Sequence, residues 1–116
     1  MKFLSPALEA SVPRHNVYVV ELSKEVLNEH KFKKHNPKYI EGKLCLYVGM
    51  TGLAPEERFK KHKAGIKSNT YVEKYGIRLL PSLYEKYNPM TYEDALAREV
   101  KIAIELQQAG NAVWQA

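Results

Sequence analysis

The longest regular pattern in the sequence is a helix predicted over residues 92–109, and it limits what so short a chain can build. Thr91 is placed to cap its first turn, and Gly110 follows as a residue that commonly ends helices. Apolar residues recur along the helix at helical spacing, which predicts a buried stripe made of Leu96, Val100, Ala103 and Leu106. A helix of this kind needs a sheet or other helices to cover the stripe.

Short segments rich in β-branched and aromatic residues precede and follow this helix. They predict strands at residues 17–22, 44–48 and 77–80, the last able to run on toward Tyr84 as an edge strand, and they offer a further short strand at 112–114. Shorter helices are predicted after Ser23, from Pro55 to Gly65 and over 70–75, with a turn at 49–52. The order predicts an α/β (α+β) fold, with a small central, mostly antiparallel three-stranded sheet flanked by helices.

A chain of 116 residues supports one domain. We expect residues 1–15 to be a lead-in and residues 16–116 to form the domain, with a basic insertion at about 23–43. No stretch is long and apolar enough to span a bilayer, and the first residues are too mixed for a secretory signal, so we expect a soluble, cytoplasmic protein. Cys45 lies in an apolar run, which favours a buried, inert thiol.

The chain is basic, with a net charge of +5 and a pI near 9.3. A solvated basic surface is one explanation, and a nucleic-acid partner is the other. The distribution favours the second, because the lysines gather in two segments: Lys31, Lys33, Lys34, Lys38 and Lys43 in one, and Lys60, Lys61, Lys63 and Lys67 in the other.

Five polar side chains are candidates for a catalytic or ligand-binding role. Glu99 falls within or at the edge of the apolar stripe, where a carboxylate is either an ion-pair partner or a ligand for magnesium. Arg58 and His62 are four residues apart and share one face of a predicted helix. They are either ordinary surface residues or groups that bind phosphate. Tyr18 and Tyr47 occupy matching places in two strands, where core tyrosines are also common. Taken singly, each position favours the structural explanation.

Together these residues resemble the GIY-YIG nuclease superfamily. The first motif matches Asn16-Val17-Tyr18, with asparagine in place of glycine, and the second matches Tyr47-Val48-Gly49. A helix with Arg58 and His62 follows, then a later helix with Glu99, then Asn111 at its end. The resemblance covers roughly residues 16–115, and the insertion between the two motifs is longer than usual for the family.

The resemblance implies a metal-dependent endonuclease that hydrolyses DNA phosphodiester bonds. Glu99 would hold one Mg²⁺ (or Mn²⁺) ion, and Tyr18 would take a proton from the attacking water. Tyr47 would hydrogen-bond the nucleophile or the phosphate, while Arg58 would neutralise charge in the transition state. His62 would position the phosphate or share the proton relay. Two further residues are implied near the substrate: Gly49, for close backbone approach, and Asn111, chiefly as an anchor.

The substrate class stays open between single-stranded and structured DNA, with low sequence specificity expected from so small a module. Tyr39, Tyr71 and Tyr75 are candidates for stacking on unpaired bases. The alternatives are a non-catalytic nucleic-acid-binding module on the same scaffold, and an unrelated structural α/β protein with a basic surface.

Overall fold

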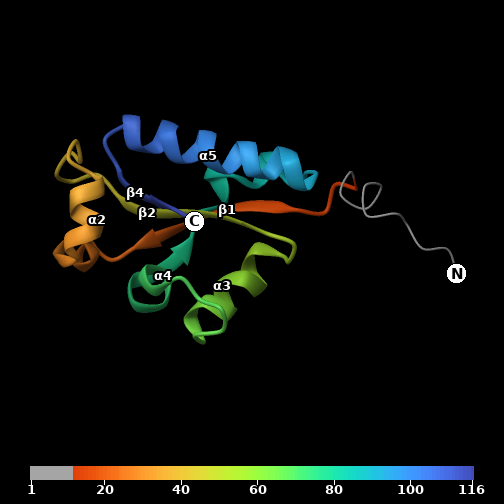
Figure 1. Cartoon of the computed structure of the whole chain (residues 1–116), viewed down its shortest axis with the longest axis horizontal. Helices are drawn as coiled ribbons and strands as arrows, with labels where there is room; N and C mark the ends of the chain where they lie inside the picture. The colour runs from red at the N-terminus through yellow and green to blue at the C-terminus, as the bar shows by residue number, and fades with distance from the viewer. Residues whose placement is uncertain (1–11) are drawn as a thin grey trace, which may run out of the picture.

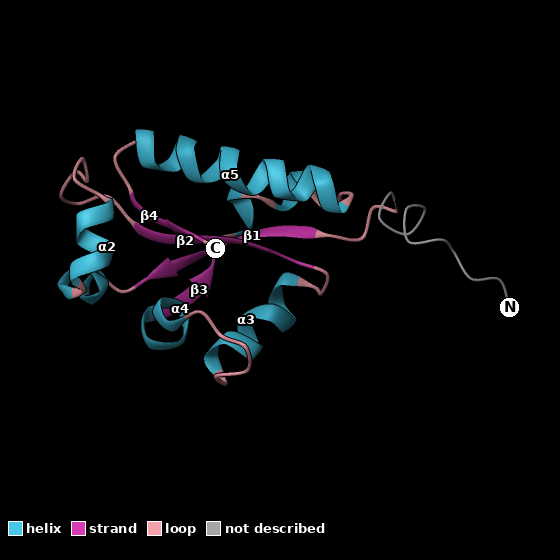
Figure 2. Ribbon diagram, in the orientation of Figure 1, coloured by secondary structure: helices cyan, strands magenta, loops and turns pink. Residues whose placement is uncertain are grey.

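A computed structural model of the chain describes residues 12–116, which form a sheet with helices on both faces (Figure 1). The strands within this range are β1 (Asn16–Leu22), β2 (Cys45–Thr51), β3 (Gly76–Leu79) and β4 (Ala112–Gln115). The helices are α2 (His30–His35), α3 (Pro55–Lys63), α4 (Thr70–Tyr75) and α5 (Tyr92–Gln108), with short 3-10 helices η1 (Lys24–Asn28), η2 (Pro81–Leu83) and η3 (Glu85–Tyr87). Helix α5 lies along one face of the sheet, and α3 and α4 lie against the other (Figure 2).

The two motif strands form the centre of the sheet. β1 and β2 pair antiparallel over their whole length, with Tyr18 opposite Gly49 and Val20 opposite Tyr47. Val17, Tyr18, Val19 and Val20 are all buried, since both faces of β1 are covered. The predicted fold class, an α+β fold in which helices flank a central sheet, is confirmed.

The prediction of a three-stranded, mostly antiparallel sheet is wrong in one respect. Within residues 12–116 the sheet has four strands in the order β3-β1-β2-β4, and β4 runs parallel to β2. The crossover through α5 returns the chain beside β2, with Cys45 opposite Ala112 and Val48 opposite Gln115. β4 is short and pairs with residues 67 positions earlier in the chain. A pairing over that distance cannot be predicted from the pattern of neighbouring residues.

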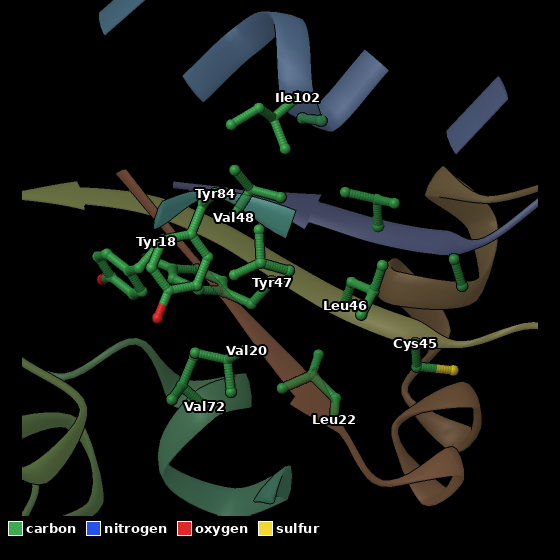
Figure 3. Packing of buried hydrophobic residues seen from close by; sticks show 14 of the residues in the cluster. Tyr18, Val20, Leu22, Cys45, Leu46, Tyr47, Val48, Val72, Tyr84 and Ile102 are labelled. Atoms are coloured by element: carbon green, nitrogen blue, oxygen red, sulfur yellow. The ribbon is translucent and has the colours of Figure 1, made fainter. Parts of the chain in front are cut away.

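The alternation of side chains assigns the polar residues to different faces of the sheet. Paired residues face the same side, so Tyr18, Val20, Tyr47 and Trp114 share the face covered by α3 and α4. Val19, Val48 and Gln115 point toward α5. Figure 3 shows the same division, with Ile102 of α5 above Val48 and Val72 of α4 below Val20.

The buried stripe of α5 differs from the predicted one. The helix begins where expected, since the Thr91 hydroxyl accepts a hydrogen bond from the backbone N–H of Asp94. Its buried residues are Ala95, Glu99, Ile102 and Ala103, whereas Leu96 and Val100 are 41% and 42% exposed. The apolar arc of α5 is wider than the sheet covers, and the flank that carries Leu96 and Val100 stays in solvent.

The insertion at residues 23–43 contains two short helices, η1 and α2, followed by a segment of turns over residues 36–43. η1 begins at Ser23, whose side chain caps it, and α2 places Phe32 in the core. Asn36, at the end of α2, donates to the Phe32 carbonyl and accepts from the backbone N–H of Val113 at 2.7 Å. This contact ties the insertion to β4.

Two predicted boundaries are wrong. β2 continues through the predicted turn to Thr51, and β3 ends at Leu79 instead of running toward Tyr84, because Pro81 opens the 3-10 helix η2. Most of the lead-in lies outside the described residues, but His15 already pairs with Met90. Over residues 12–116, none of the helices has the length and apolar character that crossing a membrane requires.

Candidate active site

The ring of Tyr18 lies across the backbone of Gly49 on the neighbouring strand. A Cβ atom built on Gly49 would stand 2.7 Å from both Cζ and Oη of Tyr18, and 3.0 Å from Cε1 of Tyr47. No other residue type leaves room for the tyrosine at that distance. The glycine therefore makes room for the Tyr18 ring, and the close approach of the Gly49 backbone to substrate stays a prediction.

Tyr18 is joined to α3 through a histidine. Its Oη lies 2.8 Å from Nε2 of His62, and Nδ1 of His62 accepts a hydrogen bond from the backbone N–H of Asn69 at 3.0 Å. Because Nδ1 is an acceptor, the proton of the neutral ring sits on Nε2 and is donated to the Tyr18 oxygen. The tyrosine hydroxyl proton is then free to be donated elsewhere.

The protonation states follow from burial. Tyr18, Tyr47 and His62 are 1%, 4% and 0% exposed. Burial, with the nearby Arg58 charge, lowers the pKa of His62 to about 4, so the ring is neutral at pH 7. Burial also raises the pKa of Tyr18 and of Tyr47 above their ordinary values, so both are phenols.

Arg58 supplies the positive charge of the site. It precedes His62 by one turn of α3, and its guanidinium donates to the carbonyls of Ile66 and Lys67 at 3.4 and 2.8 Å. Its charge lowers the pKa of Tyr18 against the larger effect of burial, and that of Tyr47 likewise. Arg58 therefore both fixes the loop after α3 and favours negative charge on the two tyrosines.

Glu99 approaches from the other face of the sheet. It is 4% exposed on the buried side of α5, and Gln115 donates to its Oε1 at 2.9 Å. Burial raises the pKa of Glu99, and its charge adds to the rise in the pKa of Tyr18 and Tyr47. β4 ends opposite Val48, one residue short of the Gly49 position that Tyr18 spans.

Glu99 is the one candidate metal ligand among these groups. Residues 12–116 hold no cluster of three or more His, Cys, Asp or Glu able to bind an ion. Magnesium keeps most of its water and needs only one or two carboxylates, so a single glutamate suits it in ligand type, whereas zinc would require more protein ligands. Because Glu99 is 4% exposed, those waters have room only when the segment around it opens. The hydrogen bond from Gln115 to Oε1 is the contact that such an ion would compete with.

Asn111 has a structural role in this fold. Its Oδ1 accepts from the backbone N–H of Leu44 at 3.1 Å, and its Nδ2 donates to the Leu106 carbonyl at 2.9 Å. It thus fastens the end of α5 to the start of β2. Both of its polar groups are used in these contacts, and a contact with nucleic acid stays a prediction.

Among the predicted substrate-binding residues, Lys63 and Tyr71 make contacts within the chain. Lys63 donates to the carbonyls of Glu73 and Gly76 at 2.9 and 3.0 Å, and Tyr71 packs edge-on against Trp114 at 5.0 Å between ring centroids. Lys63 is nevertheless exposed, as are the other predicted substrate-binding lysines: Lys31, Lys33, Lys34, Lys60, Lys61 and Lys67.

Three residues of the site escaped sequence reasoning. Asn69 caps α4 and orients His62, a position that its place before the helix could have indicated. Gln115 and Trp114 depend on the pairing of β4 with β2, for which the sequence carries no local pattern. Comparisons of this chain with protein-family models, curated proteins and solved structures give no match.

Proposed function

We propose that the chain is a divalent-metal-dependent endonuclease of the GIY-YIG type that hydrolyses phosphodiester bonds in DNA. One observation supports this above all: Tyr18 lies across Gly49, hydrogen-bonded to His62 and beside Tyr47, with the Arg58 charge acting on all three. A stable core has no need of such a polar cluster, and clusters of groups with displaced pKa values are typical of reactive sites.

In this proposal the residues have distinct tasks. The Nε2–H group of His62 donates a hydrogen bond to the Tyr18 oxygen, which stabilises the phenolate that forms when Tyr18 releases its proton to solvent. That phenolate then accepts a proton from the attacking water. Tyr47 orients the nucleophile or the phosphate, and Arg58 neutralises charge that develops on the phosphoryl oxygens. Glu99 would hold the Mg²⁺ or Mn²⁺ ion, which would supply charge stabilisation at the leaving oxygen.

The burial of these groups favours a second candidate, a non-catalytic nucleic-acid-binding module on the same scaffold. Tyr18, His62 and Glu99 are each less than a twentieth exposed. A phosphate can reach them only if the segment around them opens. A binding module predicts salt-dependent affinity for nucleic acid with no cleavage at any metal concentration.

The deciding experiment incubates the chain with labelled single-stranded, duplex and flap DNA, with magnesium, with manganese or with a chelator. The nuclease proposal expects cleavage that needs the metal and is abolished by Glu99→Gln. Glu105→Gln is the matched control, because it removes an exposed carboxylate from the same helix. Metal-dependent cleavage that survives Glu99→Gln rejects the metal ligand, and binding without cleavage of any substrate supports the binding module.

A further inference from the structure

The insertion and the C-terminal strand together build an aromatic surface that neither contains alone. Trp114 of β4 meets His35 of α2 edge-on, with 5.2 Å between ring centroids. Lys31, Lys34 and His35 are spaced three and four residues apart, so they share one face of α2. These four residues line an open depression of about 350 Å³, which we call the aromatic shelf.

The tryptophan of the aromatic shelf is held in place from below. Phe32, fully buried, stacks with Trp114 at 6.4 Å and 23° between ring planes, and Tyr71 meets its edge at 5.0 Å. The Asn36 side chain fixes α2 to the backbone of Val113, the residue before Trp114. A ring packed in this way loses little freedom when a flat ligand stacks on it.

The aromatic shelf lies next to the candidate active site. Trp114 is paired with Tyr47 across adjacent strands, and both side chains share the face that also carries Tyr18. Neighbouring strands lie about 4.8 Å apart. A strand resting on the shelf therefore passes within a few nucleotides of the buried tyrosine pair, which it contacts once the segment around the pair opens.

We propose that the aromatic shelf binds an unpaired base of a single nucleic-acid strand. Every residue that lines it is aromatic or basic: rings for the π-face of a base and lysines for the flanking phosphates. In a duplex the faces of the bases are covered by their neighbours, and an open depression has no projecting element that enters a groove. The inference rests on the proposed function for its purpose, which is to present an unpaired strand to the cutting site.

Fluorescence provides a direct test, because Trp114 is the single tryptophan of the chain. The full chain is titrated, without metal, with oligothymidylate, with an abasic oligonucleotide of equal length and charge, and with a duplex. The expected result is saturable quenching by oligothymidylate, at least tenfold weaker binding of the abasic strand, and no quenching by the duplex. Equal affinity for the thymidylate and abasic strands overturns the proposal, since charge alone would then explain binding.

Variants locate the binding to the aromatic shelf. Trp114→Leu and the exposed His35→Ala are each expected to weaken binding of oligothymidylate about tenfold, measured by anisotropy of a labelled strand, while leaving affinity for the abasic strand unchanged. Lys31→Ala with Lys34→Ala weakens both strands alike. The matched control is Lys86→Ala with Lys101→Ala, two exposed lysines that lie outside the shelf and outside both basic segments.

These outcomes separate the shelf from the catalytic proposal. Binding is measured without metal, so a chain that never cuts DNA still confirms the shelf if the base-dependent difference appears. A chain that cuts DNA normally with His35→Ala and Trp114→Leu, and binds both strands equally, rejects the shelf and leaves the nuclease proposal standing. Thermal unfolding of each variant by circular dichroism identifies loss of fold, and His35→Ala, at an exposed position, decides the matter if Trp114→Leu unfolds.

Discussion

The two faces of the sheet treat buried polar groups in opposite ways. On the α3 side, Tyr18, His62 and the backbone of Asn69 form a neutral chain of hydrogen bonds. On the α5 side, Glu99 is a lone carboxylate among apolar residues, with a single side-chain amide, that of Gln115, as its partner.

The two faces differ in the free-energy cost of burying their polar groups. A satisfied neutral network costs little to bury and fixes the positions of its members. A buried carboxylate with one amide partner costs free energy, which the raised pKa of Glu99 expresses. The α3 face is thus arranged for geometry, whereas the α5 face keeps a destabilising group, which is typical of a functional residue.

Gly49→Ala should break the ordered face most completely. The added Cβ would lie 2.7 Å from the Tyr18 ring, so the ring must leave and the bond to His62 is lost. We expect destabilisation of about 2–3 kcal/mol, measured by urea unfolding, together with loss of any cleavage. Gly52→Ala is the control, since its Cβ meets no atom nearer than 3.7 Å. Equal stability of the two variants would mean that Tyr18 does not need the glycine.

Acid should weaken the same face through His62. Its pKa is about 4 in the folded chain against an ordinary value of 6.5, so below pH 6.5 the unfolded chain binds a proton that the folded chain refuses. Stability therefore falls as pH drops from 6.5 to 4, by about 3 kcal/mol from this residue. His62→Gln should flatten that part of the pH profile in urea unfolding, and an unchanged slope would place the histidine in water.

Glu99→Gln should reveal the strain on the α5 face. The folded pKa of Glu99 lies above its ordinary value, so the carboxyl stabilises the fold only while protonated, and that contribution is lost as pH rises through the folded pKa. At pH 7 the variant should match or exceed the parent in stability, and the gap should close toward pH 4. Glu105→Gln, on the exposed side of α5, should show no such trend. A marked loss of stability in Glu99→Gln at pH 7 would show that the ionised carboxylate stabilises the fold.

The smallest effect is expected on the uncovered flank of α5. Leu96→Gln should change the free energy of unfolding by less than about 0.5 kcal/mol, because this side chain is 41% exposed. Ile102→Ala, on the buried stripe, should cost about 2–4 kcal/mol. The stability of both variants is measured by urea unfolding. Similar losses of stability at the two positions would mean that Leu96 is buried, as the helical spacing predicts.

Elements with strong local patterns can be predicted from the sequence alone. β1, β2 and the long helix were predicted within a few residues, because strand alternation, capping and helical spacing are written in neighbouring residues. The sequence also points to Tyr18, Tyr47 and His62 as candidate residues, and these three side chains lie together beside Gly49.

The face of the sheet on which each polar group lies, and the partner that it contacts, depend on how segments far apart in the chain pack together. The pairing of β4 with β2, the contact of Gln115 with Glu99 and the meeting of Trp114 with His35 join residues far apart in the chain. Helical spacing could not choose between the two apolar flanks of α5, because that choice depends on where the sheet lies. Local patterns set the conformation of a segment, whereas burial is a property of the packed molecule, which fixes the protonation and the partners of the site.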